Sequence, residues 1–398
     1  MRVTCVNSPV SPQPQAASYL YWGLMRLKVL TFNTWGVPLF SRDRSARMRA
    51  IGRALATMDV DIVLLQEVFY AGDRRVLMDA AAAGGLTFSR YFDSGLVGSG
   101  LLTLSRYPIV ESSFLRFRLN GRPQYLIRSD YYAGKGVGRA RIHTPAGPVD
   151  AHNAHFIAPY LEWGPDRFSA HRVAQALEAG QYIATQSADV PAFLGCDLNC
   201  YPDDDTYRTL LASGRLKQAC AGECEVGERN GYATIHPPSR YDYIFARSGP
   251  SQEMSAERTR IVLGGRPAPN PDGVRGYSDH YGVLTEFEFT PAADTVKIRQ
   301  AEGDGLRKLL LGSFGQGIDG IRKQRRRAGL VAAAASVSSA ALLSKNRSGV
   351  GTGTIATTAV LAALLLTGGV NLSTAARLGT ETRTLSEMLG EEPDERPG

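Results

Sequence analysis

Polar residues able to bind a metal ion or to transfer a proton stand at the ends of several apolar, strand-like segments. Asp197 and Asn199 follow the apolar run PAFLGC and lie two residues apart. Side chains two apart in a strand project from the same face, so both are expected to meet one ligand. The other residues in such positions are Asn33, Glu67, His155, Asp242, Asp279 and His280. Buried strands tolerate these groups only where partners or a metal offset the lost solvation, which favours one shared site.

Each of these residues also has a structural interpretation when it is taken alone. A glutamate at a strand end can be a surface charge, DLN can form a turn, and a lone histidine is often a satisfied core residue. The repetition of the pattern along the chain, and its order, are what favour a functional site.

Five short motifs of the chain resemble, in the same order, those of the endonuclease/exonuclease/phosphatase superfamily of metal-dependent phosphodiesterases. They are NTWG at 33–36, LLQEV at 64–68, GCDLN at 195–199, YDYIF at 241–245 and SDH at 278–280. Longer stretches, among them WGVPLFSRDRSARM, SGLVGSGLLTLSRYPI and AHRVAQALEAGQYI, are similar to the neutral sphingomyelinase branch. The resemblance extends over residues 26–290. It implies a four-layered α/β sandwich of two packed β-sheets flanked by helices, with a metal site at one end of the sheets.

The resemblance also implies roles for the polar residues. Glu67 would be the principal ligand of Mg²⁺, with Mn²⁺ as a possible substitute, because hard cations prefer carboxylate oxygen. Asn33 and Asp279 would complete or support the metal sphere. His280 would be the general base that activates water, oriented by Asp242.

The remaining candidates concern the phosphate and the leaving group. Asp197 and Asn199 would position the nucleophile and stabilise the negative charge that develops on phosphorus. His155 would bind a non-bridging phosphate oxygen or protonate the leaving alkoxide. Lys135, in YYAGKGVG, could lie near an anionic headgroup, but the segment lacks the P-loop pattern and a tight turn between strands is favoured. His171, inside an expected helix, is interpreted as structural.

One departure from the neutral sphingomyelinase pattern bears on the substrate. The chain reads HFIAPY after the first histidine, with Ile157 and Pro159 where the family has a polar residue and a glutamate. A glycerophospholipid or lysophospholipid therefore stays open beside sphingomyelin. The apolar segment WGVPLF is expected to be core, with an interfacial contact as the alternative.

Strands and helices in mixed order are expected to position these residues. Helices are expected over 45–57 and 168–186, and the mixture predicts a layered α/β domain. The expected strands are LKVLTFN, DIVLLQEV, GLLTLS, PVDAHNAHF, PAFLGCDLN, YDYIFA and GVLTEFEF.

The amino-acid composition of the chain changes after Pro291. Residues 328–343 and 354–370 are apolar and uncharged, and the basic cluster RKQRRR precedes them. A hydrophobic helical hairpin associated with the membrane is predicted, with the catalytic domain on the cytoplasmic side; an Ala-rich pair packed on the protein is the alternative. The domains expected are a leader at 1–25, a phosphodiesterase domain at 26–291, a polar and basic linker at 292–327, the two apolar helices within 328–372, and a polar tail at 373–398.

The composition indicates the redox environment of the protein, but its charge balance fits more than one kind of partner. The chain has 398 residues, a formal net charge of +7 and five cysteines. The mildly basic balance suits a membrane surface or nucleic acid equally. The odd cysteine count and the absence of an apolar signal segment predict reduced thiols, with a structural zinc site as a minor alternative.

Three other functions compete with lipid hydrolysis. A nuclease needs a basic track along the backbone, whereas the arginines of the catalytic region are scattered. An inositol polyphosphate phosphatase is disfavoured because acidic residues follow Asn199 and would repel a polyanion. A non-catalytic membrane scaffold is disfavoured because Glu67, Asp197 and His280 are all present. The expected partners are a phospholipid membrane and a lipid substrate, without nucleic acid or an obligate protein partner.

Overall fold

A computed structural model describes most of the chain, which divides into two compact units, residues 1–306 and 307–398. The described residues are 25–37, 40–122, 130–159, 166–219, 232, 241–292, 303–345, 371, 373–374 and 376–390. Residues 1–24 of the expected leader, the second apolar segment at 354–370, and Cys5, Cys220 and Cys224 lie outside them.

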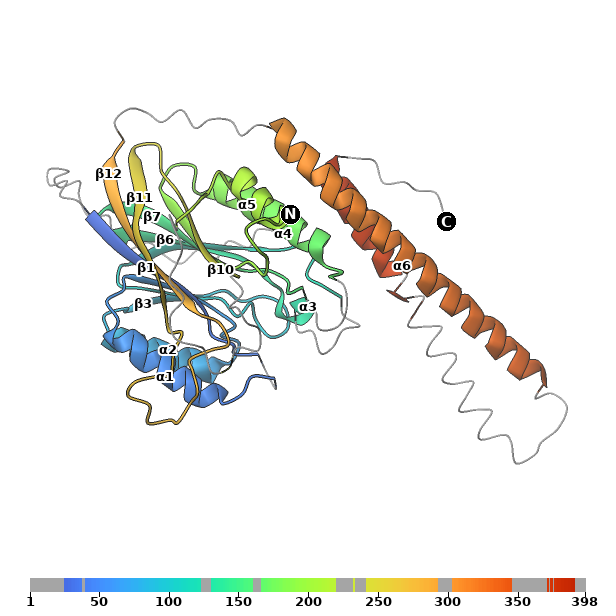
Figure 1. Ribbon diagram of the computed structural model, residues 1–398, viewed down its shortest axis with the longest axis horizontal. Coiled ribbons are helices and arrows are strands. Elements are labelled where there is room, and N and C mark those ends of the chain that lie inside the picture. The colour runs from blue at the N-terminus through green and yellow to red at the C-terminus, as the bar shows by residue number, and fades with distance from the viewer. Residues whose placement is uncertain are drawn as a thin grey trace. The chain divides into compact units, whose positions relative to one another are not determined.

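The first unit contains two six-stranded sheets (Figure 1). The first sheet has the order β11-β12-β1-β2-β4-β3, and the second has the order β5-β6-β7-β8-β10-β9. The strands of the first sheet are β1 (Met25–Asn33), β2 (Ile62–Gln66), β3 (Phe88–Tyr91), β4 (Leu102–Ser105), β11 (Gln252–Val262) and β12 (Gly282–Pro291). Those of the second are β5 (Ile109–Arg116), β6 (Gly136–Thr144), β7 (Gly147–His155), β8 (Ala192–Asp197), β9 (Lys217–Gln218) and β10 (Asp242–Arg247).

Helices cover the outer face of each sheet, which gives four layers. The first sheet carries α1 (Arg44–Thr57) and α2 (Ala71–Ala83), and the second carries α4 (Ser169–Gln186) and α5 (Asp205–Gly214) (Figure 1). A short helix, α3 (Asp130–Ala133), precedes β6. The predicted four-layered sandwich is confirmed, as are the two predicted helices, which became α1 and α4.

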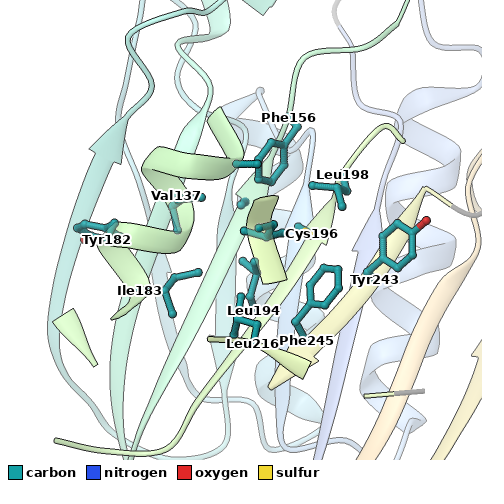
Figure 2. Packing of buried hydrophobic residues seen from close by; sticks show 14 of the residues in the cluster. Val137, Phe156, Tyr182, Ile183, Leu194, Cys196, Leu198, Leu216, Tyr243 and Phe245 are labelled. Atoms are coloured by element: carbon teal, nitrogen blue, oxygen red, sulfur yellow. The ribbon is translucent and has the colours of Figure 1, made fainter. Parts of the chain in front are cut away.

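Three apolar clusters separate these layers, because the central strands bury both faces. In β1, Leu27 and Val29 belong to the cluster between the sheets, whereas Leu30 and Phe32 belong to the cluster beneath α1 and α2. Figure 2 shows the third cluster, where side chains of β8 and β10 pack with those of α4. Apolar side chains on both faces of β1 therefore contribute to the core.

Gly195 shows how closely the two sheets approach each other beneath the polar residues. A Cβ atom at this position of β8 would lie 2.6 Å from the side chain of Leu64 and 2.8 Å from that of Thr31, both in the first sheet. Any larger residue would push the sheets apart. The glycine of the GCDLN motif is thus required for packing.

The strand register brings the polar residues to one end of the sandwich. β1 and β2 are parallel with Asn33 opposite Gln66, and β7 and β8 are parallel with His155 opposite Asp197. β10 runs antiparallel to β8 and begins with Asp242 opposite Asp197. The carboxyl ends of four strands and the start of a fifth therefore lie together.

Away from this end, a buried aspartate of β7 holds two arginines of β6. Asp150 is fully buried; its Oδ2 lies 3.0 Å from Arg139 Nε, and its Oδ1 lies 2.9 Å from Arg141 Nε. Burial alone would raise the pKa of Asp150, but Arg141 and Arg139 hold that pKa below its usual range.

Replacing Asp150 with asparagine is expected to lower the free energy of unfolding at pH 7 by about 3 kcal/mol or more, because it removes the buried carboxylate that Arg139 and Arg141 share and leaves them only the exposed Glu111 and Asp189. An aspartate with a lowered folded-state pKa stabilises above its unfolded-state pKa, and this stabilisation is lost as the pH falls through the folded-state value. The difference from the wild type should therefore shrink below about pH 4. Urea unfolding at both pH values measures this.

The matched control is Glu111→Gln. Glu111 also pairs with Arg139, at 3.1 Å, but its side chain is 57% exposed. Replacing Glu111 with glutamine should lower the free energy of unfolding by less than about 1 kcal/mol at pH 7. Equal losses for the two variants would contradict the assignment of Asp150 as the structural anchor.

The second unit contains all but the first four residues of α6 (Gly303–Lys345), which runs without a break from the expected linker into the first apolar segment. Residues 376–389 form a further helix, in which Gly379 lies beside the Arg325 guanidinium. Within the described residues, no helix combines the length and apolar content that crossing a bilayer requires. The predicted transmembrane character is therefore not supported for residues 328–343, and the hairpin is not confirmed.

Candidate active site

The carboxylate of Asp197 is the centre of the polar cluster. Its Oδ2 accepts a hydrogen bond from Asn33 Nδ2 at 2.9 Å and lies 3.3 Å from His155 Nε2 and 3.9 Å from His280 Nε2. Asp197 is almost fully buried. Burial would raise its pKa, but the positive charge that His280, His155 and Lys135 can carry holds the pKa of Asp197 well below its usual range.

His280 and Asp242 form a hydrogen-bonded pair. The distance from His280 Nδ1 to Asp242 Oδ2 is 2.8 Å. Burial would lower the pKa of His280, but Asp242, Asp197 and Asp279 together raise it well above its usual value. The pair fixes the ring and leaves Nε2 directed towards the centre of the cluster, which is the arrangement that a general base requires.

Glu67 occupies a strained position immediately after β2. Its φ is 62°, in the left-handed region that residues with a Cβ avoid. Oε1 accepts a hydrogen bond from Asn33 Nδ2 at 3.2 Å, whereas the buried Oε2 has no hydrogen-bond partner among the described residues. A Cβ atom at Gly36 would lie 2.0 Å from the Glu67 carbonyl oxygen, so the NTWG glycine is needed to accommodate this backbone.

The donor set fits a hard divalent cation. Asp197, Asp242 and His280 each offer one ligand atom, and these atoms lie within 4.8 Å of one another. Asp242 Oδ1 resembles Glu67 Oε2 in being buried without a partner among the described residues. Burial, and then the charge of Glu67, raise the pKa of Asp279 to about 6. Crowded carboxylates with unused oxygens are what Mg²⁺ and Mn²⁺ compensate.

Asn33 and Asn199 lie within the cluster as structural bridges. Asn33 Nδ2 joins Glu67 to Asp197, while its Oδ1 accepts a hydrogen bond from Trp35 N at 2.9 Å. β8 ends at Asp197, and Asn199 has φ 54°, so the expected two-residue strand alternation was the wrong reason for their proximity. Asn199 Nδ2 instead donates to Phe156 O at 3.0 Å, which ties the ends of β7 and β8 together.

Lys135 lies in the cluster, so its interpretation as part of a simple tight turn was wrong. It is buried just before β6, and its Nζ lies 2.8 Å from His155 Nε2 and donates to Phe156 O at 2.7 Å. The ammonium group therefore adds positive charge beside His155.

Two further expectations concern residues near the motifs. His171 is buried in α4, where its ring packs edge-on against Phe168 with centroids 5.2 Å apart, in keeping with a structural role. In WGVPLF, Trp35 and Val37 are half-buried but Phe40 is 54% exposed, so the core interpretation is wrong for Phe40.

Arg47, on α1, is a residue that the sequence interpretation missed. It is fully buried, and its guanidinium donates to the carbonyl oxygens of Thr34 at 2.7 Å, Trp35 at 2.6 Å and Tyr277 at 3.0 Å. The segments that carry Asn33 and His280 are thereby joined through one side chain. The available signal was an arginine four residues before Ile51, on the apolar face of an amphipathic helix.

Arg47→Lys is expected to lower kcat about ten- to hundredfold with a smaller change in KM, because lysine cannot bridge three carbonyl groups in the same plane. The exposed Arg49→Gln on the same helix should leave kcat unchanged. Steady-state kinetics with thermal unfolding would separate the two effects. A folded Arg47→Lys protein with wild-type kcat would contradict a positioning role.

The sequence of the chain is similar to a known protein family and to several of its members. Residues 30–280 match the model of the Endonuclease/Exonuclease/phosphatase family. A putative neutral sphingomyelinase of Drosophila melanogaster is 34% identical over 306 residues, covering 71% of this chain and 66% of the relative. An inositol phosphosphingolipids phospholipase C of Schizosaccharomyces pombe is 37% identical over 196 residues, covering 48% of this chain and 46% of the relative. The chain thus spans two thirds or less of these relatives' lengths.

Solved structures share the fold. A crystal structure of a Staphylococcus aureus beta toxin mutant with bound magnesium ions matches with a TM-score of 0.51 and 17% identity, covering 66% of this chain and 99% of that one. At this identity the match supports the architecture of the first unit alone.

Proposed function

The chain belongs to the endonuclease/exonuclease/phosphatase family, and from this premise we propose that it is a divalent-metal-dependent phosphodiesterase that hydrolyses a membrane phosphosphingolipid, sphingomyelin in the first instance. The products would be ceramide and phosphocholine. The observation that carries the proposal is the convergence of Glu67, His155 and His280 around the Asp197 carboxylate.

The metal would be held by Glu67 and Asp279, with Asn33 keeping Glu67 beside Asp197. Glu67 is chosen because its Oε2 is buried without a partner among the described residues. When bound, Mg²⁺ or Mn²⁺ supplies positive charge that offsets the negative charge developing on the phosphate oxygens. The magnesium ions of the beta toxin structure support this choice of cation only through the shared fold.

The chain's own residues would then carry out an in-line displacement. His280 Nε2 accepts a proton from water, while Asp242 holds the opposite ring nitrogen. The water oxygen forms a bond to phosphorus as the bond between phosphorus and the ceramide oxygen breaks. That oxygen takes a proton from His155, beside Lys135. Asp197 and Asn199 would position the attacking water.

The proposed phosphosphingolipid substrate is supported by the names of the similar proteins. Their names, neutral sphingomyelinase and inositol phosphosphingolipids phospholipase C, share a phosphodiester on a sphingolipid and differ in the headgroup. The departure at Ile157 falls on a fully buried side chain, so it lies in the core rather than against a headgroup. Pro159 is half-buried and is the departure from the neutral sphingomyelinase pattern that bears on the headgroup.

A lipid substrate implies action at a membrane surface. The cluster RKQRRR lies on α6, and its arginines would favour the anionic cytoplasmic leaflet. We infer membrane association with the catalytic unit on that side.

The proposal is tested with the purified chain on vesicles and on DNA. Vesicles would contain sphingomyelin, an inositol phosphosphingolipid, or a glycerophospholipid, each incubated with Mg²⁺ and with EDTA, and products would be identified by mass spectrometry. Mg²⁺-dependent release of ceramide from sphingomyelin is expected. Nicking of supercoiled plasmid without lipid hydrolysis would instead establish a nuclease, and inactivity on every substrate would favour a scaffold.

A further inference from the structure

A loop between β3 and β4 exposes two aliphatic side chains. Residues 93–99, called the 93–99 loop below, turn at Gly95–Val97. The side chain of Leu96 is 82% exposed, the highest value for a large apolar residue within the described part of the chain, and that of Val97 is 41% exposed. The two side chains are adjacent on one turn, unlike apolar residues scattered singly over a surface, which need no functional explanation.

The 93–99 loop is held in place by its own hydrogen bonds. Ser94 Oγ donates to Gly134 O at 2.7 Å, and Leu96 N donates to Tyr132 O at 2.8 Å. Gly95 has φ 58°, and a Cβ atom there would lie 2.3 Å from Tyr132 O, so the turn presses directly on that segment. The exposed pair is therefore presented by a fixed backbone.

Both anchors of the loop belong to the catalytic end of the sandwich. On one side, Tyr132 and Gly134 lead directly to Lys135, whose Nζ lies 2.8 Å from His155 Nε2. On the other side, Gly100 O accepts a hydrogen bond from Val68 N at 2.8 Å, next to Glu67. Leu96 and Val97 thus project from a loop that is hydrogen-bonded to the segment just before Lys135 and is followed by Gly100, which is hydrogen-bonded to the residue after Glu67.

We propose that Leu96 and Val97 insert into the surface of a phosphocholine bilayer and hold the catalytic end against it, an inference that rests on the proposed lipid substrate. The scissile bond of a phospholipid lies at headgroup level, directly above the acyl chains, so the catalytic end must approach that depth. Two aliphatic side chains are too few for a stable protein interface, which needs about 800 Å² on each partner. They suit shallow insertion, with the exposed Asp93 left among the headgroups.

Tryptophan fluorescence tests insertion directly in the full chain. Leu96→Trp is compared with Val110→Trp on vesicles of phosphatidylcholine and of brominated phosphatidylcholine, after subtraction of the signal of the native tryptophans. Val110 is the matched control because it is 60% exposed and lies next to Ile109, which pairs with Ile142, at the end of β5 remote from Gly136. A blue shift and bromine quenching of Trp at 96 only are expected.

Equal responses at the two positions, or no response at 96, would overturn the inference. This readout needs no catalysis, so it decides insertion even if the proposed hydrolysis fails. Activity gives a second measurement: Leu96→Asp should lower the ratio of kcat/KM on sphingomyelin vesicles to kcat/KM on detergent micelles at least about tenfold. Val110→Asp should leave that ratio unchanged, and an unchanged ratio for Leu96→Asp would also reject the proposal.

Discussion

Replacement of His280 with alanine is expected to reduce hydrolysis of sphingomyelin in vesicles about 10²- to 10⁴-fold, the usual contribution of a general base. The variant removes the imidazole whose Nδ1 is hydrogen-bonded to Asp242 and whose Nε2 lies 3.9 Å from Asp197 Oδ2. Because the His280 side chain is 19% exposed and lies outside the apolar clusters, the fold should persist. Single-turnover kinetics and circular dichroism measure the two effects.

His143→Ala provides the control for this change. His143 is exposed near the end of β6 and pairs with Pro148 in β7, away from the strand ends that carry the cluster. Its replacement should leave hydrolysis unaltered. A folded His280→Ala protein that retained more than about a tenth of wild-type turnover would remove the general base from the mechanism.

Glu67→Gln is expected to weaken Mg²⁺ binding and to lower activity at least about a hundredfold at a fixed Mg²⁺ concentration. The substitution keeps the shape of the side chain and its contact with Asn33 while it removes the charge. Loss of a ligand should exceed the ten- to hundredfold losses typical of residues that only support ligands. Isothermal titration with Mg²⁺ gives the affinity without reference to catalysis.

Two controls show whether the effect of Glu67→Gln is specific to the metal site. Glu253→Gln, an exposed glutamate of β11, should bind Mg²⁺ like the wild type. EDTA should inactivate the wild type, and added Mg²⁺ should restore it. Unchanged Mg²⁺ affinity in Glu67→Gln would place the cation on Asp197, Asp242 and His280 instead, the group whose ligand atoms already lie within 4.8 Å.

The fold was predictable where the sequence is continuously apolar. β2 and β8 are buried along their whole length and consist mainly of apolar residues, so their composition marks them as central strands. β11 was not anticipated because its sequence QEMSAERTRIV is largely polar and all but one of its residues are exposed or half-buried, and it is a strand because β12 offers it a hydrogen-bonding edge. Tertiary pairing, which a local pattern cannot express, decided that element.

The residues of the site likewise divide into those that the sequence predicts and those that it does not. Glu67, just after β2, and His280, just before β12, were predictable because a polar group beside a buried strand requires a partner or a metal that offsets its lost solvation. Arg47 was missed, and Lys135 was named only as a candidate near a headgroup, because the contacts of both side chains depend on backbone carbonyl groups contributed by distant segments. The change of composition near residue 328 suggested a boundary, but α6 continues through it because nothing in RKQRRRAGL stops a helix.

The most direct test of the central claim is hydrolysis of sphingomyelin vesicles by the full chain with Mg²⁺ in H₂¹⁸O. If water primed by His280 attacks phosphorus, mass spectrometry should find one ¹⁸O atom in phosphocholine and none in ceramide. Labelled ceramide, or intact sphingomyelin after prolonged incubation with folded protein, would contradict the account.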